Sequence, residues 1–499
     1  MLNDDLIDVL GIELVDVYQR LEDTVIRDIA RRLMKSDRWT ETAELQASFM
    51  RELGWSPARI RAEVIRRIHA DPEYIAFVDQ NTIEAKAVQQ EAINEAKKEL
   101  RAMAPEIYET VGNMSWNNDL SVWGKAGKKL NRTSAINQII ENYRKDGVDG
   151  ILNLTGSMGF SYPTGTVSVR RAYTKALDDA LVKTVSGSFS YTTALEDSVR
   201  ELARSGLRHI DFANKVSRGI DTAVRNALLT SFAQLAGAIM QANIESSGVG
   251  YVQVSAHWGA RPSHAMWQGK VYTLQQFRDV CGYGEPGNSA HIYSYNCRHQ
   301  HYPFWPGISE KEEFEPEPGP FTVDGKTYTY YQATQKQRAM ERRIRELKRE
   351  VNAGGDKARL GSLIRQKTQE YNSFSKAVNI RPKLERLRVA SYDKNVEIPF
   401  VFNAAGHPVW VVKKTTITGR PNSITQKINK NGGIDRNYYD ARGFQTKQIS
   451  NNDHGHKVES AYGKHGEHAH DYFWENGRVK KREIRNLTDQ EREENGDIL

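Results

Sequence analysis

One segment of the chain concentrates the side chains that bind transition metals. Both cysteines of the 499-residue chain and five of its 13 histidines lie between residues 254 and 307. Thiolate sulfur and imidazole nitrogen are ligands that Zn²⁺ prefers, in a tetrahedral set of four. The set that we consider is His264, Cys281, Cys297 and His299, which makes a structural Zn²⁺ the one cofactor that the sequence suggests. Its spacing matches no common zinc finger, so we favour the alternative in which these side chains pack a small aromatic core.

A second group of histidines lies near the C-terminal end, where five fall within residues 454–470. Histidines and carboxylates together can hold a divalent ion that activates water, which is the chemistry of a metal-dependent nuclease or a toxin-like effector. The candidate residues are Asp453, His454, His456, Glu467, His468 and His470. No nuclease motif accompanies them, so we expect instead that these histidines are dispersed over the surface of a β-rich accessory domain, with no pocket and no catalysis.

A third candidate is a basic surface for DNA. Its side chains are Arg342, Arg343, Arg345, Lys348 and Arg349. Cations neutralise phosphates without any sequence code, so such a run can bind DNA of any sequence. Glutamates are interleaved with these residues, however, and that pattern suits a salt-bridged helical hairpin equally well. Both interpretations stay open.

Enzyme signatures are missing elsewhere in the sequence. The chain has no Gly-x-x-x-x-Gly-Lys-Ser/Thr loop, no His-Glu-x-x-His motif, no Gly-x-Ser-x-Gly elbow and no kinase motifs. Residues 282–287 match Gly-x-Gly-x-x-Gly, but a dinucleotide-binding loop must open a helix, and no helical pattern follows. We therefore predict a non-enzyme with no catalytic residue, no cofactor-binding residue and no small-molecule substrate, and leave an activity open only for residues 377–499.

The elements that position these residues are mainly helical in the first half of the chain. Apolar residues recur every three or four positions over 14–33 and every four positions over 216–239, which predicts two amphipathic helices. Thr193 fits the N-cap of a capping box and Gly206 fits the end of the same helix. Between residues 105 and 166 the helical pattern loosens and turn residues accumulate.

The amino-acid composition excludes several further classes of protein. The chain is 39% hydrophobic and 27% charged, which suits a helical or elongated fold with much surface. Two cysteines exclude a disulfide scaffold and favour a reducing compartment. The N-terminus lacks the pattern of a signal peptide, and the most apolar stretch, residues 227–242, is interrupted by polar side chains. We therefore expect no membrane association.

We predict a multidomain α+β protein with a mainly α-helical N-terminal half, a small irregular β module, a basic helical hairpin and a β-rich C-terminal domain. The net charge of +7 is concentrated in the C-terminal third. The predicted segments are N-terminal amphipathic helices (1–110), a helical core (111–247), a His/Trp/Cys-rich β module (248–309), an acidic Pro-rich linker (310–328), the basic helical hairpin (329–376) and the C-terminal domain (377–499).

The β module and the helices before it resemble the phage minor capsid protein family of the minor capsid protein 2 type, which is related in role to the Mu-type head morphogenesis proteins. The resemblance covers roughly residues 1–310 and lies in Val254-Ser-Ala-His-Trp-Gly-Ala-Arg-Pro-Ser-His264, Trp267-Gln-Gly-Lys270, Asn296-Cys-Arg-His299 and Pro306-Gly307. The motif residues are His257, Trp258, Arg261, Pro262, His264, Trp267, Gly269, Asn296, Cys297, Arg298 and His299.

This resemblance implies a structural component of a tailed-phage virion that is needed for head assembly, with no established catalytic residue. It implies portal and capsid proteins as partners at the inner head, and a location in the phage head, preceded by the host cytoplasm during assembly. Two alternatives stay open, a metal-dependent effector carried in the C-terminal domain and a DNA-contacting module in residues 331–390.

Overall fold

The computed structural model describes residues 10–499 apart from positions 163–164, 188, 211–216, 286–287, 312, 394–399, 406, 413–414, 420–422, 430–431, 441–442, 456 and 476–477. The chain forms two compact units, one of Ile7–Lys394 and one that contains Asn395–Leu499. The first unit is mainly helical with small sheets, and the second is built on one mixed sheet. The predicted α+β class is therefore confirmed, while the finer division into six segments stays a prediction.

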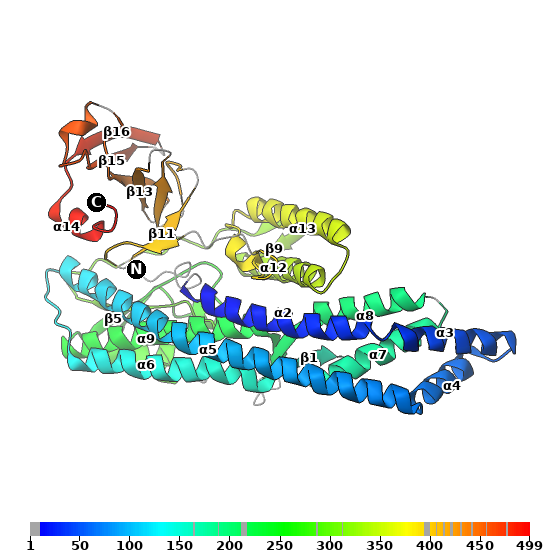
Figure 1. Cartoon of the computed structure of the whole chain (residues 1–499). Coiled ribbons are helices and arrows are strands. Elements are labelled where there is room, and N and C mark those ends of the chain that lie inside the picture. The colour runs from blue at the N-terminus through cyan, green and yellow to red at the C-terminus, as the bar shows by residue number, and fades with distance from the viewer. Residues whose placement is uncertain are drawn as a thin grey trace. The chain divides into compact units, whose positions relative to one another are not determined.

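Long helices build most of the first unit. They are α2 (Ile12–Met34), α3 (Asp37–Glu52), α4 (Pro57–His69), α5 (Pro72–Lys125), α6 (Ser134–Asn153), α7 (Val169–Val185), α8 (Tyr191–Ser205) and α9 (Ile220–Ser246). With 54 residues, α5 is about 80 Å long, and it packs along α2, α6 and α9 (Figure 1). The apolar stripe of α2, from Leu14 through Val25 to Leu33, is buried, as the predicted amphipathic helix requires.

The helical pattern does not end near residue 105. Helix α5 contains Pro105 and continues to Lys125, and α6 follows it. A proline inside a helix costs about 3 kcal/mol, and here tertiary packing outweighs that cost. The half of α5 after Pro105 buries Tyr108 edge-on against Phe232 of α9, with ring centroids 5.1 Å apart, and buries Trp123 as well.

Helix α9 is the core helix on which the β module packs. Among the described residues it alone is long and apolar enough to span a membrane, and 72% of that apolar window is buried inside the fold. A small residue in α9 permits the close approach of the module, because a Cβ at Gly237 would lie 2.4 Å from the Tyr293 ring. Gln234 also donates a 2.9 Å hydrogen bond to the Tyr293 carbonyl. The module therefore contacts α9 both by close packing and by a hydrogen bond.

The ends of α8 confirm one predicted cap and correct the other. Gly206 follows the helix with a φ of +65°, as predicted. The N-cap is Ser190 rather than Thr193, because the Ser190 hydroxyl accepts the backbone N–H of Thr193 at 3.2 Å. Serine and threonine both favour this position, so the sequence alone placed the helix start three residues too late.

Short strands and helices form the rest of the first unit. One antiparallel sheet has the order β2 (Gly165–Val167), β1 (Met158–Tyr162), β3 (Leu207–Ile210) and β4 (Ser217–Gly219). The β module has β5 (Tyr251–Val254) between β6 (Val271–Thr273) and β7 (His301–Phe304), with helices α10 (Pro262–Ala265) and α11 (Leu274–Cys281). The 3₁₀ helix η1 (Leu154–Ser157) joins α6 to β1.

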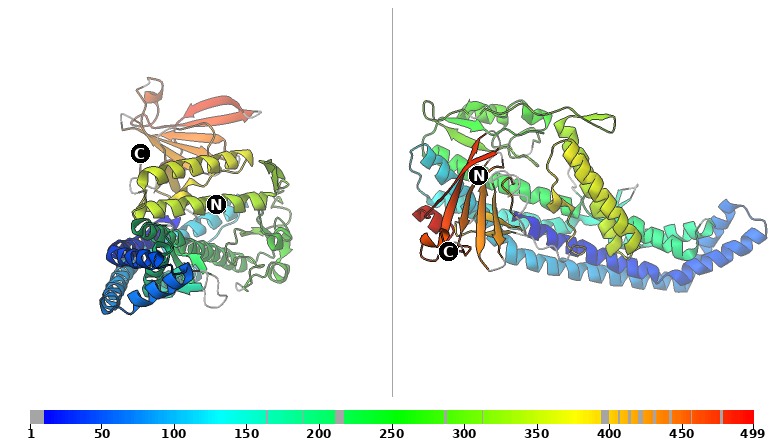
Figure 2. Two further views of the ribbon diagram at one scale, coloured as in Figure 1. Left: turned by 90° about the vertical axis from the view of Figure 1, so that its right-hand side faces the viewer. Right: turned by 90° about the horizontal axis from the view of Figure 1, so that it is seen from above.

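The predicted helical hairpin is also present. It consists of α12 (Tyr330–Asn352) and α13 (Lys357–Ala377), after the two-stranded hairpin of β8 (Phe321–Val323) and β9 (Lys326–Tyr328) and before η2 (Leu384–Leu387). The two helices lie side by side (Figure 2). The turn between them contains Gly354, whose φ of +101° suits glycine.

The second unit is a seven-stranded sheet with its strands in sequence order. The strands are β10 (Phe400–Phe402), β11 (Pro408–Val411), β12 (Ile424–Ile428), β13 (Ile434–Tyr439), β14 (Gln445–Ser450), β15 (His468–Glu475) and β16 (Arg478–Arg485). Strands β11 and β12 are parallel and the other neighbours are antiparallel. Two short helices complete the unit, η3 (Glu459–Ala461) and α14 (Asp489–Glu494).

Candidate metal centre

Strand pairing in the β module brings together segments that are distant in sequence. Strand β5 leads through residues 255–261 to α10, which carries His264, while Cys297 and His299 directly precede β7, the antiparallel neighbour of β5. Ser255 donates its N–H to the Gln300 carbonyl at 2.8 Å, and the N–H of Gln300 donates to the Ser255 hydroxyl at 2.9 Å. These bonds fix the ends of both segments, so two histidines 35 residues apart meet.

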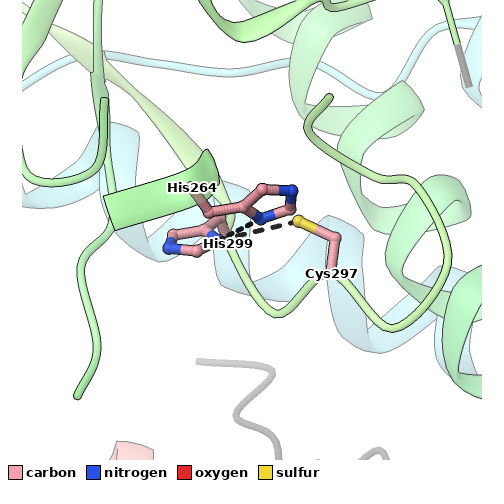
Figure 3. Close-up of side chains that lie close together, drawn as sticks. All are labelled: His264, Cys297 and His299. Atoms are coloured by element: carbon pink, nitrogen blue, oxygen red, sulfur yellow. Dashed lines mark hydrogen bonds between the residues drawn. The ribbon is translucent and has the colours of Figure 1, made fainter. Parts of the chain in front are cut away.

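Three potential ligand atoms converge at this point, all within 4.8 Å of one another (Figure 3). The Nδ1 atoms of His264 and His299 are 3.3 Å apart. The Sγ of Cys297 lies 3.7 Å from the Nδ1 of His299. All three side chains are buried, so the arrangement is closed to substrates.

The outward nitrogens of both rings are held by oxygen acceptors. His299 Nε2 lies 2.9 Å from Gln268 Oε1, and the same oxygen accepts the His257 N–H at 3.1 Å, which identifies it as the amide oxygen. His264 Nε2 lies 3.0 Å from the Ser289 carbonyl oxygen. Since both acceptors lack a proton, both Nε2 atoms must carry one. In a neutral imidazole the Nδ1 atom then carries a lone pair.

Both imidazoles are neutral at pH 7. Burial lowers the pKa of His264 to about 4, and the charge of Arg261 lowers it further against the bond to Ser289. Burial lowers the pKa of His299 to about 2, with the charges of His257 and His264 acting in the same direction. The neutral ring is the form that binds a metal ion.

The fourth residue of the predicted set lies outside this group. Cys281 ends α11 and is buried in an aromatic core with Phe277 and Tyr293. Its sulfur is not among the atoms that lie within 4.8 Å of one another. Burial also raises the pKa of the Cys281 thiol to about 12, which disfavours the thiolate that a metal requires.

Other motif residues support the three convergent side chains. The His257 ring lies against His299 with centroids 4.4 Å apart, and its Nδ1 lies 3.0 Å from the Trp258 carbonyl. Arg261 donates to the Ser289 carbonyl at 2.9 Å. Trp267 packs against both His264 and His299 and donates its indole N–H to the Ala290 carbonyl at 3.3 Å.

The remaining motif residues shape the backbone or face outward. Pro262 begins α10, where no backbone N–H is needed. Gly269 and Asn296 have positive φ values of +69° and +55°. The Trp258 indole is partly exposed and donates to the Glu315 carbonyl at 3.0 Å, and Arg298 is half-buried.

Two supporting residues escaped the sequence reasoning. Gln268 lies between the motif residues Trp267 and Gly269, and only this position in the sequence could have pointed to its role. Ser289 acts through its backbone carbonyl, so its residue type carries no signal at all.

A second cluster forms in the C-terminal sheet. His468 and His470 share one face of β15, with their Nε2 atoms 3.0 Å apart. The His454 ring meets His468 edge-on, with centroids 5.5 Å apart, and Glu459 Oε1 lies 3.6 Å from His470 Nε2. His454, Glu459 and His468 form a group of potential ligands. The expected dispersal over the surface is therefore wrong for these three histidines, because β15 turns His468 and His470 inward.

The other candidates in this part of the chain do not join the cluster. Asp453 accepts the backbone N–H of Gly455 at 2.9 Å. Glu467 accepts the N–H groups of Lys464 and His465 at 2.9 and 2.6 Å. His456 lies outside the described residues. Glu459 was missed, since nothing in its sequence surroundings marks it.

Most of the predicted DNA-binding cations are used inside the fold. Arg345 forms a 2.8 Å ion pair with Asp221 of α9. Lys348 forms a 2.8 Å ion pair with Asp393, and Arg349 lies 3.9 Å from the buried Glu22. These three side chains are nearly inaccessible to solvent, so the proposed DNA contact is wrong for them.

The two remaining cations face solvent. Arg342 is exposed, and Arg343 pairs with Glu346 at 3.0 Å on the outer side of α12. The buried side of α12 thus docks the hairpin on α2, α8 and α9.

Comparison with known families places residues 2–376 among the structural proteins of phage capsids. The matching family is phage minor capsid protein 2. Because the match covers most of the chain, the chain belongs to this family, which confirms the resemblance seen in the motif residues. Membership implies a structural, non-enzymatic component of the virion head with other virion proteins as partners. Neither a curated protein nor a solved structure matched the chain.

Proposed function

We propose that this protein is a structural minor head protein that binds the portal at the inner face of the phage head. The proposal extends the family membership, which concerns residues 2–376. The observation that supports it is an apolar face on α3 that the described residues of the chain leave uncovered. Exposed apolar patches of this kind mark contacts with other proteins.

Helix α3 carries apolar residues on two opposite sides. Its inner side buries Trp39, Ala43 and Met50. On its outer side, Leu45 is 66% exposed and Phe49 is 61% exposed, and Leu53 directly after the helix is 57% exposed. Because residues four apart are neighbours on a helix, these three form one continuous stripe.

Such a stripe fits a hydrophobic groove on a partner. Helices that dock in grooves present anchors three or four residues apart on one face, and Leu45, Phe49 and Leu53 follow one another at intervals of four. Helices α3 and α4 lie toward one end of α5, away from the β module (Figure 1). We therefore assign portal binding to this end of the helical unit.

Replacing Leu45 and Phe49 together by glutamate should remove the protein from assembled heads. Both side chains already face water, so the substitutions leave the core of the unit intact. Quantitative mass spectrometry of purified heads should find the double variant reduced at least about tenfold, because losing two apolar anchors costs more than about 1.4 kcal/mol of binding.

The matched control is Ile308→Glu, since Ile308 is 55% exposed but belongs to the segment after β7. This variant should enter heads at the level of the unmodified protein. Normal incorporation of the double variant, with a circular dichroism spectrum like that of the unmodified protein, would rule out α3 as the docking face.

The C-terminal cluster favours a second candidate function for the second unit, a metal-dependent effector. Three imidazoles and the Glu459 carboxylate meet there, and hydrolytic metal sites use such ligands. Full-length protein should then cleave DNA or RNA in the presence of a divalent ion, and His468→Ala should abolish the cleavage. Equal cleavage by both proteins, or none by either, would remove this candidate.

A further inference from the structure

Two of the distances between the three convergent atoms in the β module are those of ligands around one ion, and the third is below 4.8 Å. A tetrahedral Zn²⁺ with bonds of about 2.0 Å to nitrogen and about 2.3 Å to sulfur holds two nitrogens about 3.3 Å apart and a nitrogen and a sulfur about 3.5 Å apart. The corresponding distances are 3.3 Å between the two histidine Nδ1 atoms and 3.7 Å between His299 Nδ1 and Cys297 Sγ.

The hydrogen bonds around the same atoms leave a buried lone pair that a cation would satisfy. Both Nδ1 atoms carry lone pairs, because Gln268 and the Ser289 carbonyl hold the protons on the opposite nitrogens. The Cys297 thiol has one proton, which can serve only one of the two. At least one of these two buried acceptors, which face each other at 3.3 Å, is therefore unsatisfied without a positive charge between them. Oxygen acceptors behind ligating histidines are the usual support of zinc sites.

We propose that His264 Nδ1, Cys297 Sγ and His299 Nδ1 bind a structural Zn²⁺ that fastens α10 to the segment before β7. We assign the fourth position to His257 Nε2, which is buried beside His299 and has no hydrogen-bond partner. A rotation of the His257 ring is required, because its nitrogens are not among the atoms within 4.8 Å of one another. This inference is independent of the proposed portal binding.

The ligand set determines the kind of ion. Two or three imidazoles with one thiolate suit Zn²⁺, whereas Mg²⁺ and Ca²⁺ take oxygen ligands. The ligands are buried, with His264 and His299 each 1% exposed, so no position is open to a substrate. The ion is thus structural. It stabilises residues 282–300, which contain neither helix nor strand among their described positions.

Cobalt substitution of the full-length protein tests the proposal. A Co²⁺ ion bound to a thiolate gives a near-ultraviolet charge-transfer band, which a site made only of histidine and carboxylate lacks. The second cluster, at His454 and His468, therefore cannot produce the band. We expect the band in the unmodified protein and in Cys281→Ser, and its loss in Cys297→Ser. These variants are matched, because Cys281 and Cys297 are both buried and are the two cysteines of the chain.

Absence of the band from the unmodified protein would overturn the proposal, and so would its loss in Cys281→Ser with retention in Cys297→Ser. Elemental analysis gives a second readout, in which Cys297→Ser should hold one Zn²⁺ equivalent fewer than Cys281→Ser. His257→Ala should weaken zinc binding at least about tenfold, and unchanged affinity would refute the fourth ligand.

If Cys297→Ser does not fold, the unmodified protein still decides the question. Chelator should lower its melting temperature and added Zn²⁺ should restore it, since the bound ion stabilises the folded state. His468→Ala should show the same chelator response, because its substitution leaves the β module unchanged. Melting that is insensitive to chelator in both proteins would contradict a structural ion.

Discussion

Arg345→Ala should destabilise the helical unit by about 3–5 kcal/mol, because it leaves a buried carboxylate without its partner. Asp221 lies at the start of α9 and is almost fully buried, and Arg345 reaches it from α12 at 2.8 Å. Burial by itself would raise the pKa of Asp221, but the charges of Arg345, Arg349 and Arg225 outweigh it and hold that pKa below its usual range. Removing the nearest of these cations forces Asp221 to stay charged at a higher cost or to take up a proton.

Arg343→Ala is the matched control, since it removes the same kind of side chain from the same helix. Its partner Glu346 is solvent-accessible, and surface ion pairs of this kind contribute about 0–1 kcal/mol. Urea unfolding followed by circular dichroism measures both variants. Equal destabilisation by the two substitutions would show that α12 is not held to the core through Asp221.

Asp119→Asn should stabilise the protein, and the gain should grow as the pH rises. Asp119 is buried on α5 and accepts a 2.8 Å hydrogen bond from the side chain of Asn243. Burial raises the pKa of Asp119 to about 7, against the lowering effect of the bonds from Asn243 and Asn118. A folded-state pKa above the unfolded value means that the folded protein holds more protons, so stability falls as the pH rises towards 7.

The expected magnitude follows from the shift. The pKa of Asp119 rises from the ordinary aspartate value of 3.8 to about 7, which corresponds to about 4 kcal/mol at pH 8. The asparagine variant carries no such penalty, so its advantage in urea unfolding should increase by about 1.4 kcal/mol per pH unit between pH 4.5 and 6.5 and level off above pH 7. Asp149→Asn, at an exposed position of α6, should show no comparable slope. A constant difference across this range would contradict a buried neutral carboxyl at Asp119.

The local periodicity of the sequence was enough to predict several of the main elements. The buried stripe of α2 and the long helix α9 both follow from apolar residues that recur every three or four positions. Such signals work because a helix or strand repeats its own geometry over neighbouring residues. The motif around His264 and His299 likewise indicated the family and singled out three of the residues that converge.

The sequence failed where the outcome depends on contacts between distant segments. Helix α5 continues past Pro105 because α9 packs against the part of α5 that follows this proline. The sequence around Pro105 contains no sign of this packing energy. Spacing could not tell Cys297 from Cys281, and only the pairing of β5 with β7 decides which cysteine meets the two histidines.

The sequence was likewise unable to show which charged side chains are buried and which nitrogen of each imidazole carries the proton. Arg345 and Arg343 look alike in the sequence, yet Asp221 and burial make the first a core residue and leave the second at the surface. His468 and His470 point inward because β15 pairs with β14 in one register. The lone pairs of His264 and His299 that face each other depend on Gln268 and on a backbone carbonyl. The sequence by itself therefore determined the fold class, several elements and the family, whereas only the tertiary structure decided which polar side chains are buried together, because burial and hydrogen bonding are properties of the packed chain.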